Sequence, residues 1–249
     1  MTLTLSSLPE GYRAAVFGAS GGIGAAMLEH FEADPRCGTV HAGARSVVTP
    51  GAAKTRPFGF DLTDEDSIAA AAEQIAAGGP LHLCLVATGM LHDETGLEPE
   101  KTWRQIDARA MARAFQINAT GPALIAKHVL PFLAKDDKAV FAAISARVGS
   151  ISDNRLGGWH AYRASKAALN QILKTCSIEL ARKRPEALCV GLHPGTVDTA
   201  LSAPFQRNVP ETKLFTPAYS AERLLSVIDG LDAAATGRVF DWAGEEVAA

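Results

Sequence analysis

Residues 12–27 read YRAAVFGASGGIGAAM, an apolar run followed by a glycine-rich turn and the start of a helical pattern. The run predicts a strand at 12–18, and the pattern after the turn predicts a helix at 22–34. The turn has the spacing G-x-x-x-G-x-G, formed by Gly18, Gly22 and Gly24. Without side chains at these positions, the backbone N–H groups at the helix start approach a pyrophosphate closely. A glycine turn can be purely structural, but the strand–turn–helix order favours a dinucleotide site.

The rest of the chain alternates short apolar runs with longer helical patterns, which is typical of a parallel sheet covered on both faces. Further strands are expected at 39–45, 55–62, 81–89, 138–145, 187–195 and 238–242, and further helices at 64–77, 100–134, 160–182 and 217–230. Thr63 is expected to cap the helix at 64–77. The sequence therefore predicts an α/β fold: a single doubly wound Rossmann-type domain over residues 1–249, with a mostly parallel sheet of about seven strands.

The composition is that of an ordinary globular protein, with 47% hydrophobic and 20% charged residues among 249. A net charge of -3 and the lack of any Lys/Arg run argue against a nucleic-acid partner. The N-terminal residues have no basic start or long apolar core, and no apolar run is long enough to span a membrane. These features predict a cytoplasmic protein without a membrane partner.

The four cysteines are Cys37, Cys84, Cys176 and Cys189. They form no CxxC pair and no histidine cluster accompanies them, so no metal site is predicted. Cys84 and Cys189 lie in apolar runs that are expected to form buried strands. The pattern favours free thiols in a reducing compartment.

The end of the second expected strand bears on the choice of cofactor. An NAD site places an acid there to bind the ribose 2′-hydroxyl, but this position is occupied by Ala44 and followed by Arg45. The planar guanidinium of an arginine can pair with a 2′-phosphate, and Ser20 in the glycine turn can add a hydrogen bond. The sequence therefore favours NADP(H) over NAD(H). The alternative is that Arg45 is only a solvated loop residue.

The stretch AYRASKAALNQILK, residues 161–174, places Tyr162 and Lys166 one turn apart on the same face of an expected helix. A half-buried tyrosine beside a lysine with its charge at the surface is a common structural arrangement. The alternative is an acid and the cation that tunes it. The glycine turn earlier in the chain favours this second interpretation.

Together, the glycine turn and the YRASK stretch resemble the short-chain dehydrogenase/reductase family over nearly the whole chain. The stretches ISARVGSISDN and GGWHAYRASKAALN are similar to its C-factor and sniffer-type carbonyl reductase branch. The resemblance implies that the cofactor contacts the glycine turn, including Ile23, and that Asp61 and Leu62 lie near its adenine. Further cofactor contacts are implied for Gly89 in VATG and for Tyr162 and Lys166. The last set lies in HPGTVDT and consists of Pro194, Gly195, Val197 and Thr199. It also implies a capping segment over the substrate at about 200–216.

The family resemblance also implies a mechanism. Hydride passes between the nicotinamide and a carbonyl or alcohol carbon, and neutral Tyr162 exchanges a proton with the substrate oxygen. Lys166 is expected to lower the pKa of Tyr162 and to hold the nicotinamide ribose, and Asn118 to anchor a water that relays protons. The implied protein is an NADP(H)-dependent carbonyl reductase or alcohol dehydrogenase that forms a homodimer or homotetramer. The alternative is an NADP(H)-binding regulator without turnover.

One position departs from the family pattern. The family's serine, which binds the substrate oxygen beside the tyrosine, normally stands three residues before a glycine. Counting back from Gly149 gives Ala146. Ser145 fills the role if the backbone turns there, Ser150 is a second candidate, and a site without any serine is the third alternative.

Overall fold

The computed structural model describes residues 3–46, 48–94 and 96–249, and the apolar runs of the sequence form a seven-stranded sheet in the order β3-β2-β1-β4-β5-β6-β9. Every pairing within this sheet is parallel. The strands are β1 (Tyr12–Phe17), β2 (Cys37–Ala44), β3 (Thr55–Gly59), β4 (Leu83–Val86), β5 (Ala139–Ile144), β6 (Ala187–His193) and β9 (Val239–Asp241). The predicted doubly wound α/β fold is therefore confirmed.

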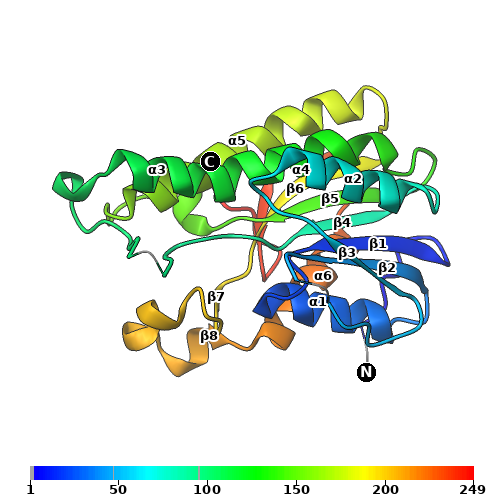
Figure 1. Cartoon of the computed structure of the whole chain (residues 1–249), viewed down its shortest axis with the longest axis horizontal. Helices are drawn as coiled ribbons and strands as arrows, with labels where there is room; N and C mark the ends of the chain where they lie inside the picture. Colours follow the sequence, from blue (N-terminus) through cyan, green and yellow to red (C-terminus); the bar gives the residue numbers. More distant parts are fainter. Residues whose placement is uncertain (1–2, 47, 95) are drawn as a thin grey trace.

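Helices cover both faces of the sheet (Figure 1). The helices are α1 (Gly22–Ala33), α2 (Glu65–Ala76), α3 (Ala108–Phe115), α4 (Gly121–Val129), α5 (His160–Ala181) and α6 (Pro217–Gly230). Buried side chains of α1 and α6 pack on one face, and those of α2, α4 and α5 pack on the other. Because both faces are buried, strands of such a sheet need apolar residues at every position.

Strand β4 illustrates this requirement. Leu83 and Leu85 pack on the α1/α6 side, while Cys84 and Val86 pack on the α2/α4/α5 side, and each of the four is at most 1% exposed. Burying a leucine side chain contributes about 1.5–3 kcal/mol to folding. The core therefore fixes the register of the strand whose end enters the site.

The expected helix at 100–134 is broken into several pieces. After the short turn η1 (Trp103–Gln105), Asp107 caps α3 by accepting from Arg109 N and Ala110 N. A π-helical turn, η2 (Gln116–Thr120), then joins α3 to α4, and Pro122 sits in the first turn of α4. Since proline has no N–H, it cannot bond to the carbonyl of Asn118 four residues earlier, and the regular α-helical pattern is interrupted there.

Other boundaries also differ from the predictions. Asp64, rather than Thr63, caps α2, because its Oδ1 accepts from Asp66 N and Ser67 N. The third and fourth strands end at Gly59 and Val86, earlier than expected, since the chain leaves the sheet to form the loops at its carboxyl edge.

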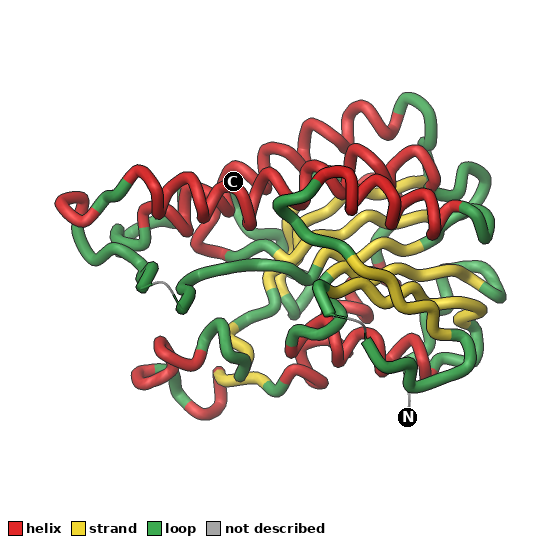
Figure 2. The backbone as a smooth tube through the Cα atoms, viewed as in Figure 1, coloured by secondary structure: helices red, strands yellow, loops and turns green. Residues whose placement is uncertain are grey.

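The segment after β6 leaves the sheet beyond its carboxyl edge. It forms β7 (Thr196–Val197), paired with β8 (Leu214–Phe215), with the short turns η5 (Ala203–Asn208) and η6 (Glu211–Lys213) between them. Figure 2 shows this small unit apart from the main sheet, on the side where the loop after β4 also runs. His92 of that loop bonds to Ala200 O through Nε2, at 3.1 Å. The predicted capping segment therefore contacts the loop after β4.

The four cysteines are free, and Cys84 and Cys189 are buried in strands as expected. In the described part of the chain, no helix combines the length and apolar character needed to cross a membrane. Within those same residues, no three or more His, Cys, Asp or Glu side chains gather as metal ligands would.

Candidate active site

The glycine turn joins β1 to α1 at the point where the strand order reverses. From β1 the chain moves outward to β2 and β3, and it then returns to β4 on the other side of β1. Open α/β sheets bind ligands in the crevice at such a switch point. The fold therefore places the turn where a dinucleotide is expected.

Close packing explains why two of the glycines are needed. Gly18 has a φ of +96°, and an added Cβ there would meet Ala87 O at 3.0 Å. An added Cβ at Gly24 would lie 2.1 Å from Gly18 O, so α1 could not pack against the turn. Either change would displace the turn, because the contacts are too short, and Gly18 also has a positive φ that L-residues rarely adopt.

The start of α1 fits a phosphate group. Gly21 is its N-cap, and no side chain caps the first turn. A Cβ at Gly22 would lie 2.6 Å from Thr199 Cγ2, so the turn also lies against the predicted nicotinamide-holding segment. A helix start with no side-chain cap favours anions. Ser20 is exposed at the turn, and Ile23 packs partly against the core.

Thr88 is a site residue that sequence reasoning missed. Its Oγ1 is buried without a hydrogen-bond partner, and its Cγ2 would lie 3.0 Å from a Cβ added at Gly18. A buried hydroxyl without a partner costs about 1–3 kcal/mol, so such groups often mark the place of a ligand. This orphan donor beside the glycine turn fits a bound dinucleotide. The only sequence signal was its place in VATG, at the end of an apolar strand.

Arg45 and Asp61 follow the neighbouring strands β2 and β3 and lie near one another. Asp61 Oδ1 accepts bonds from the N–H and the hydroxyl of Thr63, and these lower the pKa of its carboxyl, with smaller contributions from the charges of Arg45 and Arg113. Arg45 is exposed, so its guanidinium is accessible to solvent and to a ligand. Leu62 packs against Gly121, where an added Cβ would lie 2.6 Å from it.

Tyr162 and Lys166 lie in the first turns of α5, and their side chains are neighbours. The Lys166 Nζ atom lies 5.8 Å from the centre of the Tyr162 ring and donates a hydrogen bond to Ile144 O at 2.8 Å. Lys166 is only 2% exposed. Burial disfavours the charged form of each side chain, so it lowers the pKa of Lys166 to about 8 and raises that of Tyr162 to about 12.

The raised pKa of Tyr162 contradicts the sequence expectation that Lys166 would lower it. The physical reason is that burial is the dominant influence on the phenol, while the ammonium bonds to a strand carbonyl. A neutral phenol at pH 7 is still a proton donor. The lysine, with a pKa near neutrality, can itself exchange a proton.

Asn118 lies in the π-helical turn η2 and is fully buried. Its Oδ1 accepts from Met90 N and its Nδ2 donates to Met90 O, each at 2.8 Å, and Nδ2 also donates to Ser165 Oγ at 3.1 Å. A Cβ at Gly89 would lie 3.6 Å from both Asn118 Oδ1 and Lys166 Nζ. The structure thus brings Asn118, Gly89 and Lys166 together.

The serine candidates lie in different surroundings. Ser145 follows β5, its N–H continues the ladder to Leu192 O, and its hydroxyl donates to Asn170 Oδ1 at 2.5 Å. Asn170 is one turn beyond Lys166 on α5, so this hydroxyl is engaged away from the first turn that carries Tyr162. Ser150 is buried and bonds to Ala249 O at 3.4 Å. Ala146, at the family's usual position, has no side-chain donor.

The segment after β6 lies against the glycine turn, where Thr199 is next to Gly22. Gly195 has a φ of +78°, and an added Cβ would lie 2.6 Å from the Phe215 ring, so only glycine fits. Pro194 O accepts from Ser220 Oγ at 2.9 Å, which fixes the turn to α6. Val197 is buried in β7, and Thr199 follows it beside the glycine turn.

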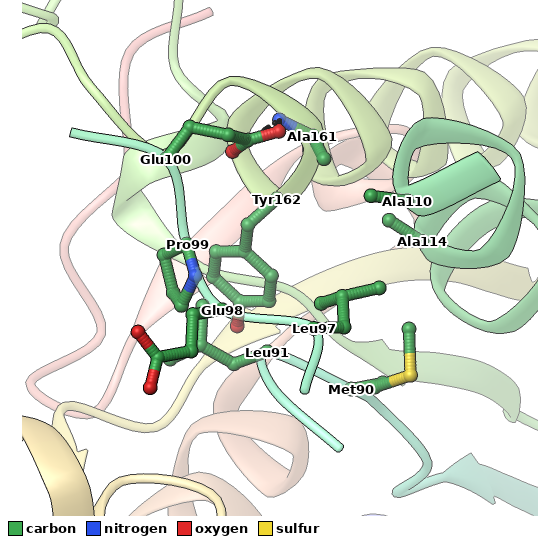
Figure 3. Close-up of a pocket in the computed structure, with 10 residues that line it drawn as sticks. All are labelled: Met90, Leu91, Leu97, Glu98, Pro99, Glu100, Ala110, Ala114, Ala161 and Tyr162. Atoms are coloured by element: carbon green, nitrogen blue, oxygen red, sulfur yellow. Dashed lines mark hydrogen bonds between the residues drawn. The ribbon is translucent and has the colours of Figure 1, made fainter. Parts of the chain in front are cut away.

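A small cavity lies against the Tyr162 ring (Figure 3). Its walls are mostly apolar and include Met90, Leu97 and Pro99. The volume is about 10 Å³, room for about one water molecule.

Aromatic rings connect Tyr162 to the capping segment. The Trp159 ring meets the Tyr162 ring edge-on at 6.2 Å and the Phe205 ring at 5.3 Å between centroids. Phe205, in η5, also meets His92 at 5.8 Å. Trp159 therefore links Phe205 of the predicted capping segment to the ring of Tyr162.

Comparison with known proteins decides the family. The family model described as short chain dehydrogenase matches residues 13–210, from β1 through the Tyr-x-x-x-Lys helix into the capping segment. The chain belongs to the short-chain dehydrogenase family. This family consists of oxidoreductases that use NAD(P), and the residues around the glycine turn fit such a cofactor.

Two curated relatives illustrate the similarity of this short-chain dehydrogenase. The C-signal protein of Myxococcus xanthus is 41% identical over 143 residues, which cover 57% of this chain and 80% of that protein. The 1-hydroxy-2-glutathionyl-2-methyl-3-butene dehydrogenase of Rhodococcus sp. is 31% identical over 182 residues, covering 72% of this chain and 74% of that one.

Solved structures share the fold at lower identity. The NADPH-bound carbonyl reductase from chicken fatty liver is 24% identical, has a TM-score of 0.82, and the match covers 98% of this chain and 97% of that one. The carbonyl reductase Sniffer of D. melanogaster is 20% identical with a TM-score of 0.81, over 96% and 99% of the two chains.

Proposed function

We propose that this short-chain dehydrogenase is an NADP(H)-dependent carbonyl reductase, with Tyr162 as its general acid and base. The observation that carries the proposal is the meeting of Tyr162, Lys166 and Asn118 at the carboxyl edge of the sheet, beside a turn in which Gly18 and Gly24 leave no room for a side chain. The family, the curated dehydrogenase relative and the NADPH-bound fold neighbour support it.

One set of residues is proposed to bind the cofactor, and another to transfer a proton to the substrate. The cofactor, when bound, supplies the hydride. The glycine turn and the start of α1 would hold its phosphates, Asp61 and Leu62 would bind the adenine, and the segment from Pro194 to Thr199 would bind the nicotinamide. Tyr162 donates its phenolic proton to the substrate oxygen, and Lys166 replaces it from solvent through the Asn118 region.

The missing serine affects how the substrate oxygen is held. Ser145 bonds to Asn170, and Ala146 carries no donor. We propose that Tyr162 is the principal hydrogen-bond donor to the carbonyl oxygen, with Ser145 contributing only after it releases Asn170. The cavity beside Tyr162 is mostly apolar, which favours an uncharged, apolar carbonyl compound.

The preference for NADPH is proposed from Arg45, which is exposed at the end of β2 where an NAD site would present an acid. Arg45→Ala is expected to weaken NADPH binding about tenfold and leave NADH binding nearly unchanged, because only the 2′-phosphate pairs with the guanidinium. Fluorescence titration of both nucleotides with wild type and variant measures this. Arg56→Ala, which removes an exposed arginine from β3, is the control. Equal NADPH affinity in wild type and Arg45→Ala would contradict the assignment.

A second candidate function is an NADP(H)-binding regulator without turnover. It is favoured by Ala146 in place of the serine, and by the small volume of the cavity beside Tyr162. Deuterium transfer from NADPH labelled at nicotinamide C4 distinguishes the two functions. The reductase yields labelled alcohol, whereas the regulator binds NADPH and yields none.

We also propose a homodimer or homotetramer in the cytoplasm. The family to which the chain belongs, whose members commonly form dimers or tetramers, supports this assembly. The mass in solution, measured by light scattering, tests this assembly.

A further inference from the structure

The helix that carries Tyr162 begins without a cap of its own. Trp159, the N-cap residue of α5, is left-handed with a φ of +54° and makes no side-chain capping bond. Gly157 and Gly158 before it also have positive φ. The N–H groups of a first helical turn have no partner inside the helix and need an acceptor from elsewhere.

Glu100 supplies that acceptor from a segment 61 residues away in the sequence. Its two carboxylate oxygens lie 3.3 and 3.1 Å from Ala161 N, and its backbone O accepts from Trp159 N at 2.5 Å. Figure 3 shows the carboxylate against the start of the helix, with the Tyr162 ring on the next residue. One residue therefore holds the backbone on both sides of His160.

The environment of Glu100 shows that this contact is its principal one. Glu100 is buried, with 5% of its surface exposed. Among the described residues, no Lys, Arg or His forms an ion pair with its carboxylate. A buried carboxylate without a cation needs hydrogen bonds and a favourable field. The N-terminal end of α5 provides both, since the helix dipole is positive there.

The same residue forms part of the substrate cavity. Leu97, Pro99 and Glu100 line it on one side and Tyr162 on another. A Cβ added at Gly158 would lie 3.3 Å from Glu100 O, so the loop before α5 rests directly on this wall. The cavity wall and the first turn of α5 are thus one connected unit.

We infer that Glu100 is a positioning residue for Tyr162: by capping α5 from the cavity wall, it fixes the direction in which the phenol enters the site. This inference rests on the proposed function of Tyr162. Glu100 touches the backbone of Ala161 and not the reacting atoms, so its effect passes through the helix. A small displacement of the phenol is enough to slow the proton transfer.

Three substitutions at Glu100 separate the effect of side-chain length from the effect of charge. Glu100→Gln keeps the length and one oxygen acceptor, Glu100→Asp keeps the charge but is one methylene shorter, and Glu100→Ala removes both. We expect kcat to fall about tenfold to a hundredfold in the Asp and Ala variants and less than about threefold in Gln. NADPH affinity should stay within about twofold in all three, because the glycine turn is untouched. Glu94→Ala, an exposed carboxylate of the same loop, is the control and should match wild type.

Hydrogen exchange of the Ala161 amide gives a readout that does not depend on turnover. It should be slow in wild type and Glu100→Gln, and at least about tenfold faster in Glu100→Asp and Glu100→Ala. If Glu100→Ala does not fold, the comparison of Glu100→Gln with Glu100→Asp still tests the inference. Wild-type kcat in Glu100→Asp or Glu100→Ala despite fast exchange of the Ala161 amide would overturn the inference, because turnover would then not depend on the cap. Equal kcat in all variants would also overturn it. If wild type itself reduces no carbonyl, the proposed function fails, and unchanged Ala161 exchange would separately refute the cap.

Discussion

Tyr162→Phe is expected to lower kcat for carbonyl reduction by about 10³-fold while leaving NADPH affinity within about twofold. The ring, and with it the edge-on contact to Trp159, is retained, so the walls of the cavity stay in place. What is lost is the phenolic proton, and the structure offers no equivalent donor at Ala146. Steady-state kinetics together with a fluorescence titration of NADPH measure the two effects.

Tyr219→Phe serves as the matched control for this change. Tyr219 is 45% exposed on α6, and the substitution removes the same hydroxyl from a residue outside the proposed proton path. Its kcat should equal that of wild type. Normal turnover by Tyr162→Phe would remove the tyrosine from the mechanism.

Lys166→Met is expected to abolish turnover and, at pH 7, to stabilise the ligand-free protein by about 2 kcal/mol. Burial lowers the pKa of Lys166 from 10.5 to about 8, so the folded state carries a penalty for its charge at neutral pH. Methionine removes this penalty of about 3 kcal/mol but loses the bond to Ile144 O, worth about 1 kcal/mol. Chemical denaturation of wild type and variant measures the difference.

The pH dependence of the stability gained in Lys166→Met identifies its cause. Below pH 8 the lysine is charged in both the folded and the unfolded state, and the full penalty applies. Between about pH 8 and 10.5 only the unfolded state keeps the proton, so the stability of the wild type rises relative to Lys166→Met. The gain from methionine should therefore shrink across this window. A gain that is independent of pH, or a loss at pH 7, would show that the buried charge is not the reason.

Much of the fold was predictable because local pattern and burial agree. The glycine spacing at 18–24 fixes the β1–α1 turn, and the apolar residues of β4 predict a strand buried on both faces. The broken helix at 100–134 was not predicted, although Asp107 and Pro122 are its signals. Thr63 and Asp64 are both able to cap a helix, and a boundary of one residue is set by tertiary context.

The site was only partly predictable for a different reason. Sequence spacing places Tyr162 and Lys166 together because they share one helix, but it contains no information on how deeply they are buried, and burial sets their pKa values. Glu100 reaches Ala161 across 61 residues, and no local pattern encodes that contact. Thr88 is identified as a candidate site residue only because its buried hydroxyl has no hydrogen-bond partner in the structure.

The most direct test of the account is the transfer of deuterium from NADPH labelled at nicotinamide C4 to an uncharged ketone or aldehyde. Wild-type protein is expected to produce alcohol that carries one deuterium on the former carbonyl carbon, detected by mass spectrometry, and Tyr162→Phe only traces of it. NADPH binding without labelled alcohol from any member of a broad carbonyl panel would contradict the reductase and favour the regulator.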